Sequence, residues 1–134
     1  MEAKKIIITG GATRIGAAIA RKLSSSNVEI VIHFNKSKSK AEKLKKELQN
    51  KGTKVYLVKG DLSKEPDVNK IVKFAKFKLK YFDCLINNAS LFENDKLENF
   101  NTNSWGKHLR TNLRTPALLS KEFARNIKGC LLYT

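Results

Sequence analysis

Hydrophobic and polar residues alternate along the chain with two different periods. Short apolar runs rich in β-branched residues predict strands, and segments whose apolar residues recur every three or four positions predict helices between them. The predicted strands are residues 5–9, 28–34, 54–59, 82–87 and 130–134. The predicted helices are residues 15–26, 38–49, a segment that begins near Pro66 and reaches Leu79, and 104–126.

This alternation of strands and helices predicts an α/β fold with one parallel sheet covered on both faces. Right-handed crossovers give the expected strand order 3-2-1-4-5, and a ligand crevice at the carboxyl ends of the first and fourth strands. The chain is therefore expected to form one domain, residues 1–134, with a Rossmann-type doubly wound sheet that is truncated after its fifth strand.

The first and the last predicted helices each carry apolar residues at helical spacing. In the first helix these residues are Ile15, Ala18, Ile19 and Leu23. Pro116 lies inside the last helix and is expected to bend it, because proline lacks the N–H group that continues a helix. The apolar residues of this last helix are Trp105, Leu109, Leu113, Leu119 and Phe123.

The chain is strongly basic, with a formal net charge of +15, and all but five of its 27 basic residues are lysines. These lysines are spread over the predicted helices, and no nucleic-acid-binding motif is visible. We therefore expect a solvated lysine-rich surface and no specific nucleic-acid partner, with weak binding to polyanions at low salt. A basic nucleic-acid-binding protein built on the same scaffold is the alternative.

Other features bear on the compartment. No apolar stretch approaches 18 residues, so we expect no transmembrane helix and no membrane partner. The apolar run after Met1 is too short for a secretory signal. Cys84 and Cys130 have neither a metal-ligand spacing nor a disulfide pattern, and we expect both to be small buried hydrophobic residues. These observations favour the cytoplasm and no bound metal.

A glycine-rich segment from Thr9 to Gly16 joins the first strand to the first helix. Small residues in such a turn let backbone N–H groups approach a pyrophosphate at the positive end of the helix. The strand–turn–helix context is the one that a dinucleotide site requires. The alternative is a glycine-rich turn of another Rossmann-like fold.

The end of the second strand indicates which dinucleotide is bound. An NAD site needs an acidic residue about 20 residues after the glycines, to accept a hydrogen bond from the ribose 2′-hydroxyl. Residues 33–37 contain no acid, whereas Lys36 and Ser37, together with Arg14, can donate to a 2′-phosphate. The sequence therefore favours NADP(H), unless Lys36 is one more surface lysine.

Two further strand ends carry candidate residues. Asp61 follows the third strand and can accept a hydrogen bond from an adenine amino group, although it is equally suited to cap a helix. Ala89 and Ser90 follow the fourth strand and are small enough to let it pass close to a ribose.

Together these segments resemble the short-chain dehydrogenase/reductase family over nearly the whole chain. The segments that carry the resemblance are Thr9-Gly10-x-x-x-Arg14-Ile15-Gly16, Asp61-Leu62, Asn87-Asn88-Ala89-Ser90 and Asn112-x-x-x-Pro116. Arg14 and Ser90 stand where the family usually has glycine. These departures, together with residues 33–37 and 90–92, resemble the pteridine reductase subgroup.

The resemblance implies a role for each matching residue. Ser90 and Phe92 would contact a flat heterocyclic substrate, although Phe92 is equally well explained as a hydrophobic anchor for its loop. Asn112 would position a water molecule in the proton relay, and its alternative role is to satisfy polar groups beside a bent helix. The residues implied in cofactor binding are Gly10, Arg14, Ile15, Gly16, Phe34, Asn35, Lys36, Ser37, Asp61, Leu62, Asn88, Ala89 and Ser90.

The family's catalytic Ser and Tyr-x-x-x-Lys pair are not found in these residues. Tyr56 and Tyr81 are followed four positions later by Gly60 and Leu85. The resemblance thus implies an NADP(H)-dependent oxidoreductase for a pterin-like or small carbonyl substrate, homo-oligomeric when complete, with the chain as given inactive. The alternative is a non-catalytic nucleotide-binding module or a truncated gene product.

Overall fold

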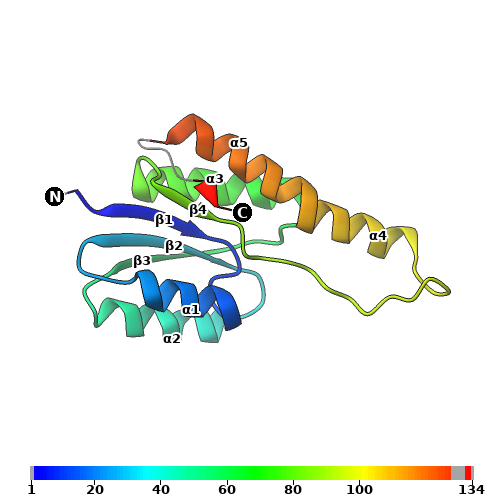
Figure 1. Cartoon of the computed structure of the whole chain (residues 1–134), viewed down its shortest axis with the longest axis horizontal. Helices are drawn as coiled ribbons and strands as arrows, with labels where there is room; N and C mark the ends of the chain where they lie inside the picture. Colours follow the sequence, from blue (N-terminus) through cyan, green and yellow to red (C-terminus); the bar gives the residue numbers. More distant parts are fainter. Residues whose placement is uncertain (1, 128–131, 134) are drawn as a thin grey trace.

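Strands and helices alternate along the chain as the hydrophobic pattern predicts (Figure 1). We describe the protein from a computed structural model, which covers residues 2–127 and 132–133. Cys130 and most of the predicted fifth strand lie outside these residues. The strands are β1 (Lys4–Ile8), β2 (Val28–Phe34), β3 (Lys54–Lys59), β4 (Cys84–Ile86) and β5 (Leu132–Tyr133). The helices are α1 (Arg14–Leu23), α2 (Lys38–Gln49), α3 (Glu65–Leu79), α4 (Thr102–Leu109), the π-helical turn η1 (Arg110–Arg114) and α5 (Thr115–Asn126).

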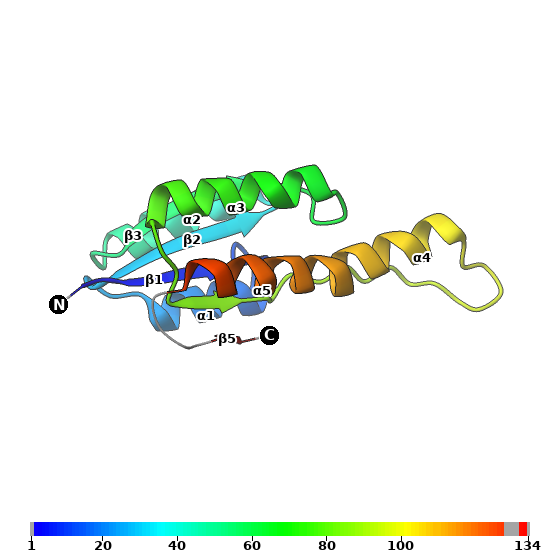
Figure 2. The same cartoon turned by 90° about the horizontal axis from the view of Figure 1, so that it is seen from above.

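The strands form one parallel sheet in the order β3-β2-β1-β4-β5, which confirms the predicted order. Helices α1 and α2 cover one face of the sheet, and α3 and α5 cover the other (Figures 1 and 2). β2 and β3 are added on one side of β1, whereas β4 and β5 are added on the other, so the loops that follow β1 and β4 diverge. Such a divergence opens a crevice at the carboxyl ends of the strands.

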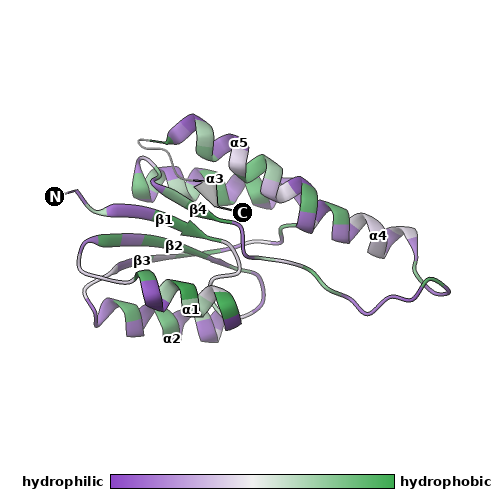
Figure 3. Ribbon diagram, viewed as in Figure 1, coloured by the Kyte–Doolittle hydropathy of each residue, from purple (hydrophilic) through white to green (hydrophobic). Residues whose placement is uncertain are grey.

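Side chains that alternate along each strand divide the core into two layers. Ile6 and Ile8 of β1 pack with α1 and α2, whereas Ile7 between them packs with α3 and α5. Every residue of β2 is buried because helices cover both of its faces. The same contrast appears in Figure 3, where the central strands are coloured mainly hydrophobic and the helices carry hydrophilic stretches.

Helix α1 packs against the sheet through a different face from the one predicted. Its buried residues are Gly16, Ala17 and Ala20, whereas Ile15 is 70% exposed and Leu23 is 37% exposed. Small side chains let the helix approach the sheet closely, and the larger aliphatic residues are thereby turned outward. Of the predicted stripe, Ile19 packs against this layer of the core, whereas the prediction was wrong for Ile15, Ala18 and Leu23.

The predicted last helix is divided into α4, η1 and α5. Pro116 lies in the first turn of α5, where its missing N–H group needs no helical partner. The preceding residues form the π-helical turn, so the departure from α-helical hydrogen bonding lies just before the proline. Leu119 and Phe123 are buried, but Trp105, Leu109 and Leu113 are exposed because α4 projects beyond the sheet (Figure 2).

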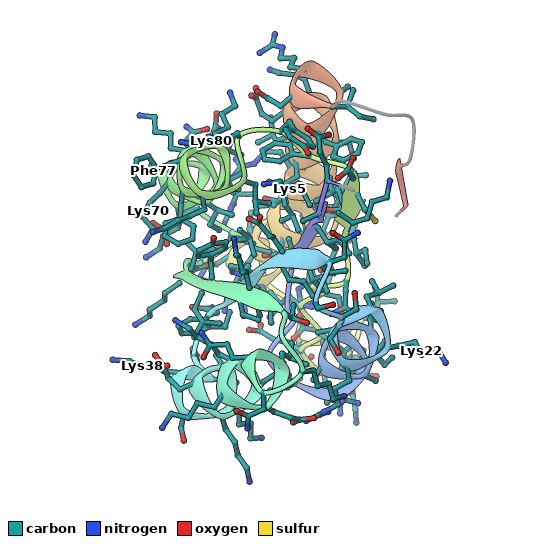
Figure 4. The ribbon with its side chains drawn as sticks, turned by 90° about the vertical axis from the view of Figure 1, so that its left-hand side faces the viewer. Lys5, Lys22, Lys38, Lys70, Phe77 and Lys80 are labelled. Carbon is teal, nitrogen blue, oxygen red and sulfur yellow. The ribbon has the colours of Figure 1, made fainter. Side chains whose placement is uncertain are left out.

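The charged surface is dispersed. Lys22 of α1 and Lys38 of α2 point away from the molecule on opposite sides, and Lys70 and Lys80 lie in the region of α3 (Figure 4). Cys84 is half-buried and packs against the core, and this partial burial raises the pKa of its thiol. No helix in the described residues is long and apolar enough to cross a membrane.

Candidate functional site

A cleft of about 730 Å³ opens where the first four strands end, at the predicted crevice. The segment that follows each of these strands contributes lining residues, among them Gly10, Asn35, Asp61 and Asn88. The residues predicted for the cofactor or substrate that line it are Gly10, Arg14, Ile15, Phe34, Asn35, Lys36, Ser37, Asp61, Leu62, Asn88, Ala89, Ser90 and Phe92. Gly16 and Asn112 are not among its lining residues.

The glycine-rich turn between β1 and α1 forms one wall of the cleft. Gly10 has a φ of +61°, and Arg14 has a φ of +50° although it is not glycine. Gly16 lies behind the turn, where a Cβ atom would be 2.2 Å from the carbonyl oxygen of Gly10. Gly16 is therefore required for close packing of α1 on the turn and has no direct place in the cleft.

Thr9 and Asn88 join the ends of β1 and β4. The side-chain amide of Asn88 donates to the carbonyl oxygens of Thr9 (3.0 Å) and Gly10 (3.1 Å). The Thr9 hydroxyl in turn accepts hydrogen bonds from the backbone N–H groups of Asn88 and Ala89, both at 3.1 Å. These bonds fix the two diverging loops to each other at the base of the cleft.

His33, near the end of β2, joins the turn to the end of β3. Its Nδ1 accepts a hydrogen bond from the Gly10 N–H (3.1 Å), and its Nε2 lies 2.9 Å from the Gly60 carbonyl oxygen. The imidazole is almost fully buried, with 2% of the residue exposed. This burial lowers the pKa of His33 below its ordinary value, against the bond to Gly60.

Asp61 both lines the cleft and shapes the loop beyond β3. Its Oδ1 accepts from the backbone N–H (2.9 Å) and the hydroxyl (2.7 Å) of Ser63. Burial acts to raise the pKa of Asp61, but these bonds and the nearby Lys64 and Lys107 hold it below its ordinary value. The N-cap of α3 is Lys64, so Asp61 stabilises the approach to the helix and does not cap it.

The corner of the cleft between β1 and β2 is basic. Arg14, Lys36 and Ser37 all line it, and residues 33–37 bring no carboxylate there. Neither Arg14 nor Lys36 has an ion-pair partner in the part of the chain that the structure describes. Two exposed cations without carboxylate partners can bind an anion at this corner.

Asn112 lies in η1 and holds the loop that follows β4. Its Oδ1 accepts from the Leu91 N–H (2.7 Å), and its Nδ2 donates to the Leu91 carbonyl oxygen (2.8 Å). Both polar atoms of the amide therefore contact the loop backbone. These contacts are with the loop and not with the helix around Pro116, so they do not decide between the two predicted roles, and the water-positioning role stays a prediction.

A second polar cluster fastens the same loop to α4. The carboxylate of Glu93 pairs with Lys107 at 3.0 Å, and this ion pair lowers the pKa of Glu93. His108 Nε2 accepts from the Glu93 N–H, and its Nδ1 contacts the Ser104 carbonyl oxygen. Glu93, Asp95 and His108 lie close enough to hold a metal ion. However, both nitrogens of His108 are already hydrogen-bonded, so the cluster serves to hold the loop after β4 against α4.

Phe92 is 85% exposed and lies between the cleft and a neighbouring apolar groove of about 470 Å³. Such exposure contradicts the alternative in which Phe92 anchors its loop by burial. Leu97, Phe100 and Trp105 contribute to the groove, and the rings of Phe100 and Trp105 are 6.0 Å apart. Contact of Phe92 with a substrate stays a prediction.

Sequence reasoning missed several residues of the cleft. His33 was noted only as part of a segment, although a polar residue near the end of a mainly apolar strand is a usable signal. Lys107 and Thr111 also line the cleft, and both lie within about one helical turn of Asn112. The others are Ala12, Thr13, Leu91 and Glu93.

The short chain dehydrogenase family matches residues 4–130 of the chain. Short-chain dehydrogenase/reductase FrzI of a Cladobotryum species is 32% identical over 116 residues, which make up 87% of this chain and 45% of that protein. A short chain dehydrogenase of Burkholderia cenocepacia in complex with NADP superposes with a TM-score of 0.88 and 25% identity, over 94% of this chain and 51% of that one. FolM alternative dihydrofolate reductase 1 of Brucella canis, complexed with NADP, gives a TM-score of 0.82 and 33% identity, over 90% and 49% of the two chains. The chain thus spans about half the length of the relatives that it matches.

Proposed function

Because the chain belongs to the short-chain dehydrogenase family, we propose that its cleft binds NADP(H) and forms the cofactor site of an oxidoreductase. The observation that carries this proposal is the basic corner, where Arg14, Lys36 and Ser37 lie together without a carboxylate from the end of β2. A carboxylate there would repel a 2′-phosphate, whereas two cations attract one. The similar structures from Burkholderia and Brucella are complexes with NADP, which supports the same choice.

The cofactor would extend along the strand ends. Its pyrophosphate would lie at the amino end of α1, where Gly10 and Ile15 line the cleft and the helix dipole is positive. Its adenine would lie near Asp61 and Leu62, with Phe34 and Asn35 beside the adenosine ribose. The nicotinamide half would follow the end of β4 past Asn88, Ala89 and Ser90. Gly16 would not contact the cofactor and would affect its binding by allowing α1 to pack closely on the turn.

We propose a flat heterocycle such as a pterin as the substrate. Ser90 and Phe92 lie at the β4 side of the cleft, where an exposed ring can stack on a bound heterocycle and a hydroxyl can hydrogen-bond to it. The similarity to the Brucella FolM reductase favours this class over a generic carbonyl compound. Titration calorimetry of a pterin into the NADP-loaded chain, with wild type and Phe92→Ala compared, tests this assignment.

NADPH supplies a hydride when it is bound, and the reaction also needs a proton donor near the substrate. The titratable residues that line the cleft are Arg14, His33, Lys36, Asp61, Glu93 and Lys107. His33 is buried, Asp61 and Glu93 have lowered pKa values, and arginine and lysine hold their protons too tightly near neutral pH. The absence of a suitable acid among these residues favours a second candidate, a nucleotide-binding module without catalysis of its own.

The preference for NADPH is tested by titrating cofactor fluorescence with wild type, Lys36→Ala and Lys46→Ala. A charge-assisted hydrogen bond contributes about 1.5–3 kcal/mol, so loss of Lys36 should weaken NADPH binding about 10- to 100-fold and leave NADH binding unchanged. Lys46 is exposed on α2 and does not line the cleft, so its variant is the matched control. Equal affinity of the wild type for NADPH and NADH would show that the basic corner does not bind the 2′-phosphate.

A further inference from the structure

His33 is a polar side chain buried in a strand that is otherwise almost entirely apolar. β2 is buried over its whole length, and its one other polar residue, Glu29, forms an ion pair with Lys5 near the opposite end of the strand. Burial of an imidazole costs free energy unless both of its nitrogens have hydrogen-bond partners. Both nitrogens of His33 have such partners, and each partner belongs to a different loop of the cleft.

The two hydrogen bonds require one form of the ring. Because the Gly10 N–H can only donate, Nδ1 must be an unprotonated acceptor. Because the Gly60 carbonyl can only accept, Nε2 must carry the proton. The neutral ring protonated at Nε2 is therefore the form that satisfies both loops, and a ring protonated at Nδ1 would set two donors against each other at Gly10.

The bond to Gly10 acts on the turn that forms the proposed pyrophosphate site. Gly10 has a left-handed φ of +61°, and the N–H of the next residue, Gly11, donates to the His33 carbonyl oxygen at 3.0 Å. Two successive N–H groups of the turn are thus held by one residue of β2. The bond to Gly60, in contrast, fixes the end of β3, where the Gly60 N–H also donates to the Phe34 carbonyl oxygen.

We propose that His33 is a positioning residue of the cofactor site, whose Nδ1 holds the Gly10 N–H so that the turn presents the start of α1 to the pyrophosphate. This inference rests on the proposed function, because it assumes that the cleft binds NADP(H). His33 acts through Gly10 and has no need to contact the cofactor. Its two nitrogens have separable effects: the Gly60 bond stabilises the fold, and the Gly10 bond also sets cofactor affinity.

Two substitutions separate these effects. In His33→Asn the side-chain oxygen can occupy the position of Nδ1 and accept from Gly10, but the side chain is too short to reach Gly60. In His33→Gln the terminal amide can reach Gly60, but no acceptor remains beside Gly10. We expect both variants to have a lowered melting temperature. We expect NADPH affinity to stay within about three-fold of wild type in His33→Asn and to fall about ten-fold in His33→Gln.

Amide exchange of Gly10, followed by NMR in the cofactor-free chain, reports on the same bond without any ligand. The Gly10 N–H should be protected in wild type and His33→Asn and should exchange faster in His33→Gln. A wild-type Gly10 amide that exchanges as fast as an unbonded loop amide would overturn the inference even if His33→Gln does not fold.

The inference and the proposed function fail in distinguishable ways. If wild type binds NADPH and a folded His33→Gln binds it equally well, the role of His33 is wrong and the proposed function stands. If wild type binds no NADPH, both are wrong. A stability loss in His33→Gln with unchanged NADPH affinity would show that His33 stabilises the fold and does not affect cofactor binding.

Discussion

At the scale of single residues, Arg14 combines a useful charge with an unfavourable backbone conformation. Its φ of +50° lies in the left-handed region, where side chains other than glycine cost about 1–2 kcal/mol. The family resemblance placed a glycine at this position, and the structure gives a physical reason for that preference. Glycine would adopt this conformation more easily than arginine. We therefore infer that the arginine is retained for its charge.

Arg14→Gly should therefore change stability and affinity in opposite directions. We expect the free energy of unfolding to rise by about 1 kcal/mol, because the strain is relieved. NADPH affinity should fall about ten-fold, because a charged donor to the phosphate is lost. Arg14→Ala is the matched control: it loses the charge but keeps a Cβ atom in the strained conformation, so only affinity should fall. Denaturant unfolding and cofactor titration measure the two effects, and a stability loss in Arg14→Gly would contradict the argument.

His33 should make stability depend on pH. Burial lowers its pKa in the folded chain, with Lys70 acting in the same direction and the Gly60 bond, Asp61 and Asp67 opposing it. Below the ordinary histidine value of about 6.5, the unfolded chain therefore takes up a proton more readily than the folded chain. The contribution of His33 to the free energy of unfolding is complete above that pH. It is lost as the pH falls below this value, by up to about 1.4 kcal/mol per pH unit.

Denaturant unfolding between pH 5 and 8 measures this dependence. His33→Asn removes the titrating group and keeps every other one, so the difference in unfolding free energy between wild type and this variant isolates the contribution of His33. A difference that does not change with pH would show that His33 is not a buried neutral imidazole.

At the scale of elements, the hydrophobic pattern predicted where strands and helices begin and end better than it predicted which of their residues pack in the core. The predicted bounds of β2, α2 and β3 agree with the structure because a continuous apolar run or a clear helical stripe defines each of them. The pattern found Ile19 but missed the buried residues of α1, because Gly16, Ala17 and Ala20 are small and carry little hydrophobic signal. Close approach of a helix depends on distances between backbones, which a sequence does not state.

Several residues of the site could be predicted for a similar reason. Strand ends are recognisable from the sequence, and the residues that follow β1, β2, β3 and β4 meet in the cleft because parallel strands end at the same edge. The hydrogen bonds that hold the site together were not predictable. The contacts of His33 with Gly10 and Gly60 depend on strand register, and those of Asn112 with Leu91 depend on a π-helical turn.

Two glycines in helices should respond oppositely to alanine. Gly16→Ala should lower the free energy of unfolding by about 1–3 kcal/mol, because its Cβ atom would overlap the Gly10 carbonyl oxygen at 2.2 Å. Gly106→Ala in α4 should raise it by about 0.5–1 kcal/mol, since its Cβ atom would meet only the flexible Arg110 side chain and alanine favours a helix. Thermal unfolding of both variants tests the contrast, and equal effects would show that α1 can move away from the turn.

At the scale of the whole molecule, the cleft is suited to a cofactor, but the described residues that line it include no positioned acid. We therefore predict that the purified chain transfers hydride from NADPH at well below about 1 s⁻¹ with pterins, quinones and small carbonyl compounds. A general acid contributes typically 10²- to 10⁴-fold to such reactions. His108, a candidate substitute acid on α4, has both nitrogens hydrogen-bonded.

Oxidation of NADPH, followed by absorbance in protein free of host reductases, measures this activity. Turnover above that rate which is abolished in His108→Ala or Asn112→Ala would contradict the prediction, because it would place an acid or a relay within these residues. Turnover that is unchanged in both variants and decreases on further purification would indicate a contaminant.

The hydrogen bonds between Thr9 and Asn88 also have a consequence for the time course of synthesis. The two residues are 79 positions apart in the sequence. At about 5–20 residues per second, the glycine-rich turn is synthesised roughly 4–16 s before Asn88. During that interval the turn lacks the bonds that close the base of the cleft. A nascent chain stalled before residue 88 should therefore fail to be protected from proteolysis by NADPH, and one stalled after the fourth strand has emerged should be the first that the cofactor can capture.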